Sequence, residues 1–254
     1  MPPAIPIIEV DGLAVRYDLR LDRQNTLRRR LTGMVTGSGE RREFWALRGV
    51  SFRVRRGDCL GVIGVNGAGK STLLQVLAGI LDPSVGRVRV DGRVSTLLTL
   101  GAGFDPDLSG RDNVFLSGAF MGISRQEMQA RLPGIKEFAG LGDFIDAPVR
   151  MYSSGMRARL GFSIASAVEP DVLLVDEVLS TGDAGFRARS KERVRELVRR
   201  AGAVVLVTHD TNWVLEFCSH ALLLDGGVMI ASGGPADVVR IYRDRVAASP
   251  RAAA

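Results

Sequence analysis

The sequence feature that most constrains this chain is a glycine-rich segment at 64–71, which reads Gly-Val-Asn-Gly-Ala-Gly-Lys-Ser. It follows a short apolar run at 59–65 and precedes residues with helical spacing at 71–80. A buried strand, a glycine loop and a helix in this order are typical of a phosphate-binding loop, because backbone N–H groups can surround phosphate oxygens at the positive end of a helix. The chain contains only three lysines, so the lysine at the end of this loop is unusually informative.

The residues of this loop are expected to hold the phosphates of a nucleotide. Lys70 would neutralise the charge that develops during phosphoryl transfer, and Ser71 would ligate Mg²⁺. Backbone N–H groups would surround the β- and γ-phosphate oxygens. The predicted nucleotide-binding residues of the loop are Asn66, Gly67, Ala68, Gly69, Lys70, Ser71 and Thr72.

A second motif lies at 172–177, where four apolar residues are followed by two carboxylates. Such a run predicts a buried parallel strand, and open α/β sheets bind their ligands at the carboxyl ends of these strands. Asp176 therefore suits a magnesium ligand, and Glu177 suits a base that polarises an attacking water. An acidic strand end alone is common at protein surfaces, so this interpretation depends on the phosphate-binding loop.

Short strands alternate with helices along most of the chain, which predicts a single α/β domain with a mostly parallel core sheet over residues 1–254. Three segments depart from this alternation. Residues 7–17 alternate in polarity around Asp11-Gly12 and predict an antiparallel hairpin in an N-terminal β-subdomain. Residues 19–43 form an arginine-rich insertion, and residues 103–168 form a helical subdomain.

Composition and charge narrow the class of protein further. With 46% hydrophobic and 24% charged residues, the chain has a globular composition. No apolar run approaches the roughly 18 residues of a membrane span, and the N-terminus lacks the features of a secretory signal, so a cytosolic location is expected. Cys59 and Cys218 lie in apolar surroundings and are predicted to be reduced core thiols rather than a disulfide. The basic residues at 187–200 are predicted to form the solvated face of a helix.

These motifs resemble those of the ATPase subunits of ABC transporters, and the resemblance covers nearly the whole chain. Residues 152–156, Tyr-Ser-Ser-Gly-Met, occupy the place of that family's signature sequence. Asp183 follows the acidic strand end as the family's D-loop aspartate does, and His209 ends a later strand as its switch histidine does. The resemblance implies an ABC-type P-loop NTPase fold, hydrolysis of ATP with Mg²⁺ as cofactor, and contact of His209 with the γ-phosphate.

The resemblance also implies that two subunits complete each active site. The signature residues that would meet the nucleotide of a second subunit are Ser153, Ser154 and Gly155. Ser153 suits a helix N-cap, and the free N–H groups behind it suit an anion. A homodimer or a pair of ATPase subunits is therefore expected. Tyr17 is placed like the family's adenine-stacking aromatic residue, with Trp45 and Phe44 as alternatives.

Three segments, 98–104, 152–162 and 182–186, resemble the branch of the family that exports lipid-linked polysaccharides such as O-antigen, capsule, teichoic acid and galactan. The branch implies a separate membrane permease, a lipid-linked glycan substrate, and a peripheral position at the cytoplasmic face of the inner membrane. The chain departs from the common pattern because no glutamine stands at the expected Q-loop and no acidic residue stands near Thr99. Some members add a carbohydrate-binding domain after the ATPase, and none is expected within these 254 residues.

Two other classes of P-loop protein are alternatives to an export ATPase. A soluble ABC-type ATPase acting on nucleic acid or ribosomes would suit the sequence pI near 10.0, but such proteins usually need coiled-coil arms or tandem ATPase units, so no nucleic-acid partner is expected. A P-loop GTPase would need an Asn-Lys-x-Asp segment, which is absent. The insertion at 19–43 is most simply a solvated loop, with anionic lipid, a membrane partner or the glycan pyrophosphate as alternative contacts.

Overall fold

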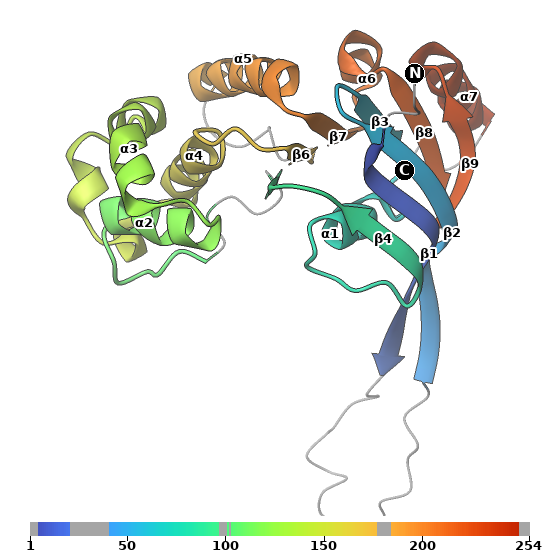
Figure 1. Ribbon diagram of the computed structural model, residues 1–254, viewed down its shortest axis with the longest axis horizontal. Helices are drawn as coiled ribbons and strands as arrows, with labels where there is room; N and C mark the ends of the chain where they lie inside the picture. The colour runs from blue at the N-terminus through green and yellow to red at the C-terminus, as the bar shows by residue number, and fades with distance from the viewer. Residues whose placement is uncertain (1–4, 21–40, 97–100, 102, 177–183, 249–254) are drawn as a thin grey trace, which may run out of the picture.

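A six-stranded, mostly parallel sheet forms the centre of the computed structural model, which describes residues 5–20, 41–96, 101, 103–176 and 184–248 (Figure 1). The strand order is β5-β6-β7-β3-β8-β9, and only the β8–β9 pair is antiparallel. The six strands are β3 (Cys59–Ile63), β5 (Val94–Thr96), β6 (Val172–Val175), β7 (Ala203–Val207), β8 (His220–Asp225) and β9 (Val228–Gly233). This arrangement confirms the predicted α/β class with a mostly parallel core.

A second, antiparallel sheet has the order β2-β1-β4, from β1 (Pro6–Arg20), β2 (Arg41–Arg55) and β4 (Val85–Val90). The predicted hairpin at Asp11-Gly12 is wrong, because β1 runs through this point as one strand. Its pairing with β2 shifts register between Val10 and Leu13, and Gly12 has a φ of 58°. The glycine therefore forms a bulge, which bends a strand without ending it.

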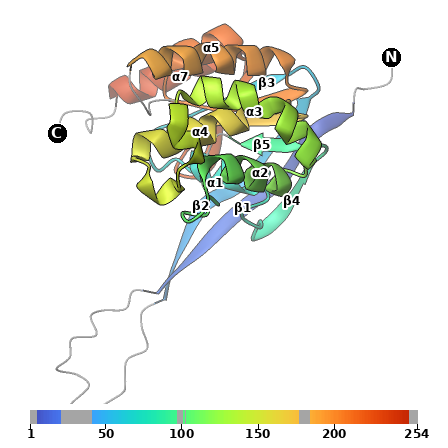
Figure 2. The same cartoon turned by 90° about the vertical axis from the view of Figure 1, so that its left-hand side faces the viewer.

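The hairpin of β1 and β2 extends away from the rest of the molecule (Figures 1 and 2). Its backbone pairing continues to Leu19↔Arg42 and Arg20↔Arg41. The paired strands thus reach into both ends of the predicted insertion at 19–43, since ladder hydrogen bonds join backbone groups whatever the side chains are. Its middle part, 21–40, lies outside the described residues.

Both faces of the six-stranded sheet are buried at its central strands β6, β7, β3 and β8. Val172 and Leu174 of β6 pack with α1 (Lys70–Leu77) and the antiparallel sheet, whereas Leu173 and Val175 pack on the opposite face. That second face is covered by α5 (Ala184–Arg200), α6 (Thr211–Phe217) and α7 (Pro235–Ala248) (Figure 1). Strands buried on two faces have continuous apolar sequences, which is why the apolar runs predicted them.

The helical subdomain predicted at 103–168 contains α2 (Gly110–Phe120), α3 (Arg125–Ala139) and α4 (Ser154–Ala165), with 3₁₀ turns at Gly142–Asp146 and Val149–Met151. These helices lie to one side of the sheet and enclose a hydrophobic cluster of their own (Figure 1). Two side chains cap these helices: the side chain of Ser109 accepts from the Asp112 N–H, and Ser124 forms a full capping box with Glu127. The 3₁₀ turns were not predicted.

Candidate nucleotide-binding site

The phosphate-binding loop lies between the end of β3 and the start of α1, as predicted. Gly67 and Gly69 have φ angles of 79° and 100°, which residues with a side chain rarely adopt. Lys70, the first residue of α1, is 8% exposed, and its Nζ donates to the carbonyls of Gly64 at 2.7 Å and Val65 at 3.0 Å. The lysine charge is thus held against the loop that would receive the phosphates.

The core of the protein holds this loop in place. Leu73 and Leu74 of α1 are fully buried, and burial of each such side chain contributes about 1.5–3 kcal/mol. Among the residues that the structure describes, no side chain caps the start of α1, where Gly69 stands at the N-cap. Unused N–H groups at a helix start are suited to a phosphate.

Backbone segments distant in sequence also support the loop. A Cβ atom on Gly69 would lie 2.5 Å from the Ala46 carbonyl oxygen of β2. A Cβ atom on Gly227, in the turn between β8 and β9, would lie 2.6 Å from the same oxygen. The Gly227 carbonyl accepts from the Arg48 N–H at 2.8 Å, and the Gly227 N–H donates to the Ala68 carbonyl at 3.1 Å. Sequence reasoning did not predict this contact between the β8–β9 turn and the loop.

Two further site residues leave the sheet at the same edge. In the parallel register Val175 of β6 pairs with Leu206 of β7, and Val207 pairs with Val62 of β3. Asp176 and Thr208-His209 therefore follow their strands beside the start of the loop. Asp176 is half-buried, and His209 is exposed. Thr208 is buried, and its hydroxyl accepts from the Asp210 N–H at 3.0 Å, which fixes the turn after β7.

The donor atoms at this edge suit a magnesium ion. Ser71 is exposed in the first turn of α1, and Asp176 lies one residue beyond β6. A hydroxyl and a carboxylate oxygen, completed by phosphate and water oxygens, are the ligands that Mg²⁺ takes in proteins. Three predicted features, Glu177, Asp183 and the Q-loop segment around Thr99, lie outside the described residues.

The three candidate adenine-stacking residues occupy neighbouring positions of β1 and β2. Tyr17 pairs with Phe44, and Arg16 pairs with Trp45. Tyr17 is half-buried against the hydrophobic core, and the Arg16 guanidinium lies over the Trp45 ring at 5.8 Å. Phe44 is 50% exposed. Tyr17, Phe44 and Trp45 thus lie close enough together in the strand pair for each to be a candidate for adenine stacking.

The signature segment forms the start of α4. The side-chain oxygen of Ser153 accepts from the Met156 N–H at 3.2 Å, so Ser153 is the predicted N-cap. Ser153 and Ser154 are exposed and Gly155 is half-buried, and a Cβ on Gly155 would meet only Ser153 Oγ, at 3.8 Å. Within one chain, α4 lies in the helical subdomain, away from α1 (Figure 1). The chain thus does not bring its signature residues to its own phosphate-binding loop.

Tyr152 holds the segment that leads into α4. Its side chain is 3% exposed, and its hydroxyl donates to the Phe144 carbonyl oxygen. Burial raises the pKa of Tyr152, so the hydroxyl keeps its proton and its donor role at neutral pH. Sequence reasoning named Tyr152 only as part of the signature. Its anchoring role depends on a contact with the 3₁₀ turn that was not predicted.

This fold and site define a P-loop nucleotide-binding domain. Residues 47–180, more than half of the chain, match the ABC transporter family, and the chain therefore belongs to that family. Two relatives are named "O-antigen export system ATP-binding protein RfbB". One, from Myxococcus xanthus, is 44% identical over 79% of this chain and 46% of its own length. The other, from Klebsiella pneumoniae, is 41% identical over 81% of this chain and 84% of its own length.

The fold also resembles solved structures. A dimeric ATP-binding cassette in a post-hydrolysis state, bound to ADP and Pi, matches with a TM-score of 0.68 at 20% identity, over 90% of this chain and 98% of that one. The family prediction is thus confirmed, and the relatives carry names of the predicted branch. This chain spans about half the length of the Myxococcus relative. Within the described ranges, none of the helices has the length and apolar character needed to cross a membrane.

Proposed function

We propose that this chain is the ATP-hydrolysing subunit of an exporter, and that it drives a lipid-linked polysaccharide through a separate membrane permease. The observation that carries the proposal is the gathering of the phosphate-binding loop, Asp176 and His209 at the carboxyl edge of three adjacent strands. The names of the two O-antigen export relatives support the export role and the class of substrate. The subunit would work at the cytoplasmic face of the membrane, attached through the permease.

The reaction is transfer of the γ-phosphoryl group of ATP to water. Lys70 and His209 would stabilise the charge that develops on the phosphate oxygens, which is the largest catalytic contribution in such reactions. Ser71 and Asp176 would hold Mg²⁺, whose charge offsets that of the phosphates. Glu177 would orient and polarise the attacking water. Tyr17, or one of its neighbours Trp45 and Phe44, would stack on the adenine ring.

A homodimer would complete each of the two sites. The exposed start of α4, with Ser153, Ser154 and Gly155, would face the γ-phosphate bound to the other protomer. Asp183 would contribute from the segment between β6 and α5. In this arrangement the second protomer would cover the start of α4, which is exposed in the single chain.

A Glu177→Gln variant tests the hydrolytic part. We expect ATP affinity to change by less than about threefold, and turnover to fall by about 10²-fold or more, because general-base catalysis contributes on the order of 10²–10⁴. Equilibrium binding of ATP and phosphate release measure the two effects. Glu169→Gln is the matched control, since Glu169 is an exposed carboxylate paired with Arg200. Unchanged turnover in Glu177→Gln would remove Glu177 from the role of base.

Purification of the tagged chain from detergent-solubilised native membranes tests the export part. A multi-span permease that co-purifies in equal amounts is the expected result. Recovery from the soluble fraction only, together with nucleic acid or ribosomes, would retain the ATPase assignment and overturn the export assignment. Release of the chain from its permease by high salt would further indicate that charged surfaces contribute to the attachment.

A further inference from the structure

The two cysteines of the chain lie in contact although 158 residues separate them in sequence. Both are free and buried, and their sulfur atoms share a hydrogen bond at 3.6 Å. Cys59 is the first residue of β3, the strand that leads into the phosphate-binding loop. Cys218 is the residue after α6, the helix that follows His209. The contact between the two sulfur atoms therefore joins β3, which leads into the phosphate-binding loop, to the end of α6, which follows His209.

Packing and backbone hydrogen bonds hold the two sulfur atoms together. Cys59 and Gly61 point to the same face of β3, because side chains alternate along a strand. A Cβ on Gly61 would lie 2.8 Å from Val214 Cγ1 and 3.0 Å from Cys218 Sγ, so the missing side chain lets α6 approach the strand. The Ser219 N–H donates to the Cys59 carbonyl at 2.9 Å, and the Cys59 N–H donates to Ser219 Oγ at 3.2 Å.

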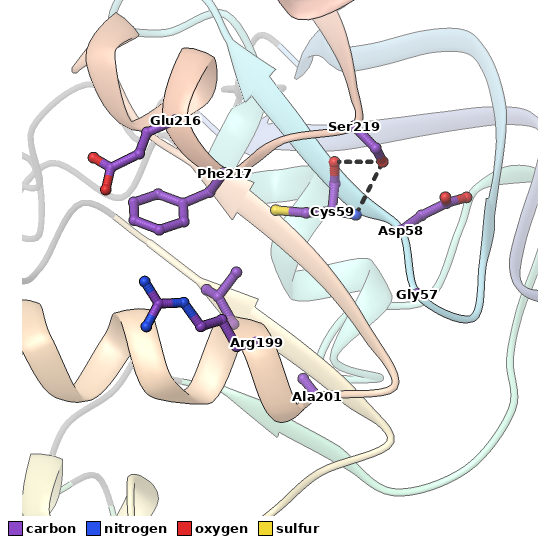
Figure 3. A pocket seen from close by; sticks show the side chains of 9 residues that line it. Gly57, Asp58, Cys59, Arg199, Ala201, Glu216, Phe217 and Ser219 are labelled. Carbon is purple, nitrogen blue, oxygen red and sulfur yellow. Dashed lines mark hydrogen bonds between the residues drawn. The ribbon is translucent and has the colours of Figure 1, made fainter.

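A pocket borders one of the two cysteine residues. Cys59 lies on the wall of a cavity of about 410 Å³, together with Asp58, Arg199 and Phe217 (Figure 3). Cys218 is not among the residues that line it. The cavity lies at the amino end of β3, opposite to the phosphate-binding loop. A small neutral oxidant in this cavity would lie beside Cys59, and nucleotide at the other edge of the sheet does not block its path.

We propose that Cys59 and Cys218 form a dithiol site that hydrogen peroxide converts into an intramolecular disulfide. The Cys59 sulfur attacks one peroxide oxygen, the O–O bond breaks, and water leaves with the thiol proton, giving a sulfenic acid at Cys59. The Cys218 sulfur then attacks the Cys59 sulfur, the S–O bond breaks, and a second water carries away the Cys218 proton. Two thiols are oxidised by two electrons, and one peroxide is reduced to two waters.

The geometry and the thiol chemistry agree with this order of steps. A disulfide has an S–S distance of about 2.05 Å, so the two sulfur atoms, now 3.6 Å apart, must approach by about 1.5 Å. The hydrogen bond to Cys59 and burial raise the pKa of Cys218, which keeps this residue a neutral thiol. The contact between the two sulfur atoms places Cys218 to resolve a sulfenic acid formed at Cys59, with the Cys218 proton lost in that step. The site does not depend on the proposed export function.

The test treats the full-length folded chain with hydrogen peroxide, with and without ATP, and measures intact mass and thiol content. Because the chain has only two cysteines, loss of two hydrogens without a covalent dimer identifies the Cys59–Cys218 disulfide. We expect this product in both conditions and its reversal by dithiothreitol. Covalent dimers, added oxygen without loss of both thiols, or no reaction at millimolar peroxide would each overturn the proposal.

Single-cysteine variants assign the order of the steps. Cys218→Ser should accumulate a sulfenic acid at Cys59 that dimedone traps, because the resolving thiol is missing. Cys59→Ser should react with peroxide at least about tenfold more slowly, because Cys218 is not on the pocket wall. Cys218→Ala repeats the first experiment if the serine hydroxyl disturbs folding. Equal rates for the two single variants would overturn the assignment of Cys59 as the residue that meets peroxide.

Discussion

The phosphate-binding loop and the start of α4 both present backbone N–H groups at the beginning of a helix, but the chain surrounds only the first. The loop is enclosed by β2 and the β8–β9 turn, and Lys70 bonds to its carbonyls at 2.7 and 3.0 Å. The start of α4 has one cap, Ser153, and its first residues are exposed. The phosphate-binding loop is thus completed within one chain and can bind nucleotide by itself, whereas the exposed start of α4 can be covered by another molecule.

The largest expected effect comes from removing the Lys70 charge from the enclosed phosphate-binding loop. Lys70→Ala deletes the ammonium group and its two bonds to the loop carbonyls. Loss of a charge-assisted bond to a phosphate costs about 1.5–3 kcal/mol, which is roughly 10- to 100-fold in ATP affinity, and hydrolysis should fall further. Isothermal titration with ATP measures the first effect. Wild-type affinity in Lys70→Ala would contradict the assignment of this lysine to the phosphates.

A second effect tests whether enclosure by β2 shapes the loop. In Gly69→Ala the new Cβ meets the Ala46 carbonyl at 2.5 Å in addition to the strain of a positive φ. We expect loss of ATP binding together with a lower melting temperature. Gly79→Ala is the matched control, because Gly79 has a φ of 70° with nothing within 4 Å of its Cβ. It should cost about 1–2 kcal/mol of stability, from backbone strain alone, and leave ATP affinity unchanged.

An equal loss of ATP affinity in Gly79→Ala and Gly69→Ala would show that general destabilisation, not the contact with Ala46, accounts for the defect. Circular dichroism melting curves for both variants separate these outcomes. The comparison is informative because the two glycines flank the same helix, α1.

Local patterns in the sequence predicted the enclosed loop, the strands and the helix caps, because each depends on residues within a few positions of one another. The Ser153 cap is an example. The support of the loop by Gly227 and Ala46 could not be predicted in this way, since it depends on contacts between distant segments. The same is true of the sulfur contact, whose members are 159 positions apart. Gly12 was misread because glycine serves both turns and bulges.

The basic helix α5 also makes contacts with distant segments that its local sequence pattern did not predict. Val194 and Leu197 are buried as their helical spacing predicted, and Val198 is half-buried. The prediction that the arginines form only a solvated face is incomplete. The Arg193 guanidinium lies 5.7 Å from the Phe138 ring centre in α3, and Arg195 lies 5.9 Å from that of Trp213 in α6. Helical periodicity gives the direction of a side chain but not the ring that another element brings beside it.

The smallest expected effect concerns the exposed start of α4. It tests whether Ser153 only caps the helix or also contributes to a contact between subunits. Ser153→Ala removes the bond to the Met156 N–H, which costs about 1 kcal/mol of stability. Because the start of α4 is far from the loop of its own chain, ATP affinity of the monomer should not change. ATP-driven dimer formation, measured by analytical ultracentrifugation in a Glu177→Gln background, should weaken by about fivefold or more.

Ser109→Ala supplies the matched control for this last experiment. Ser109 caps α2 with the same kind of bond, to the Asp112 N–H at 3.1 Å, so its loss should cost a similar amount of stability. Only Ser153 lies at the helix end that the proposed dimer uses. If Ser109→Ala weakens the dimer as much as Ser153→Ala, the defect arises from loosening of the helical subdomain. If Ser153→Ala alone does so, the open helix end acts across the subunit boundary, and the contrast with the enclosed loop is functional.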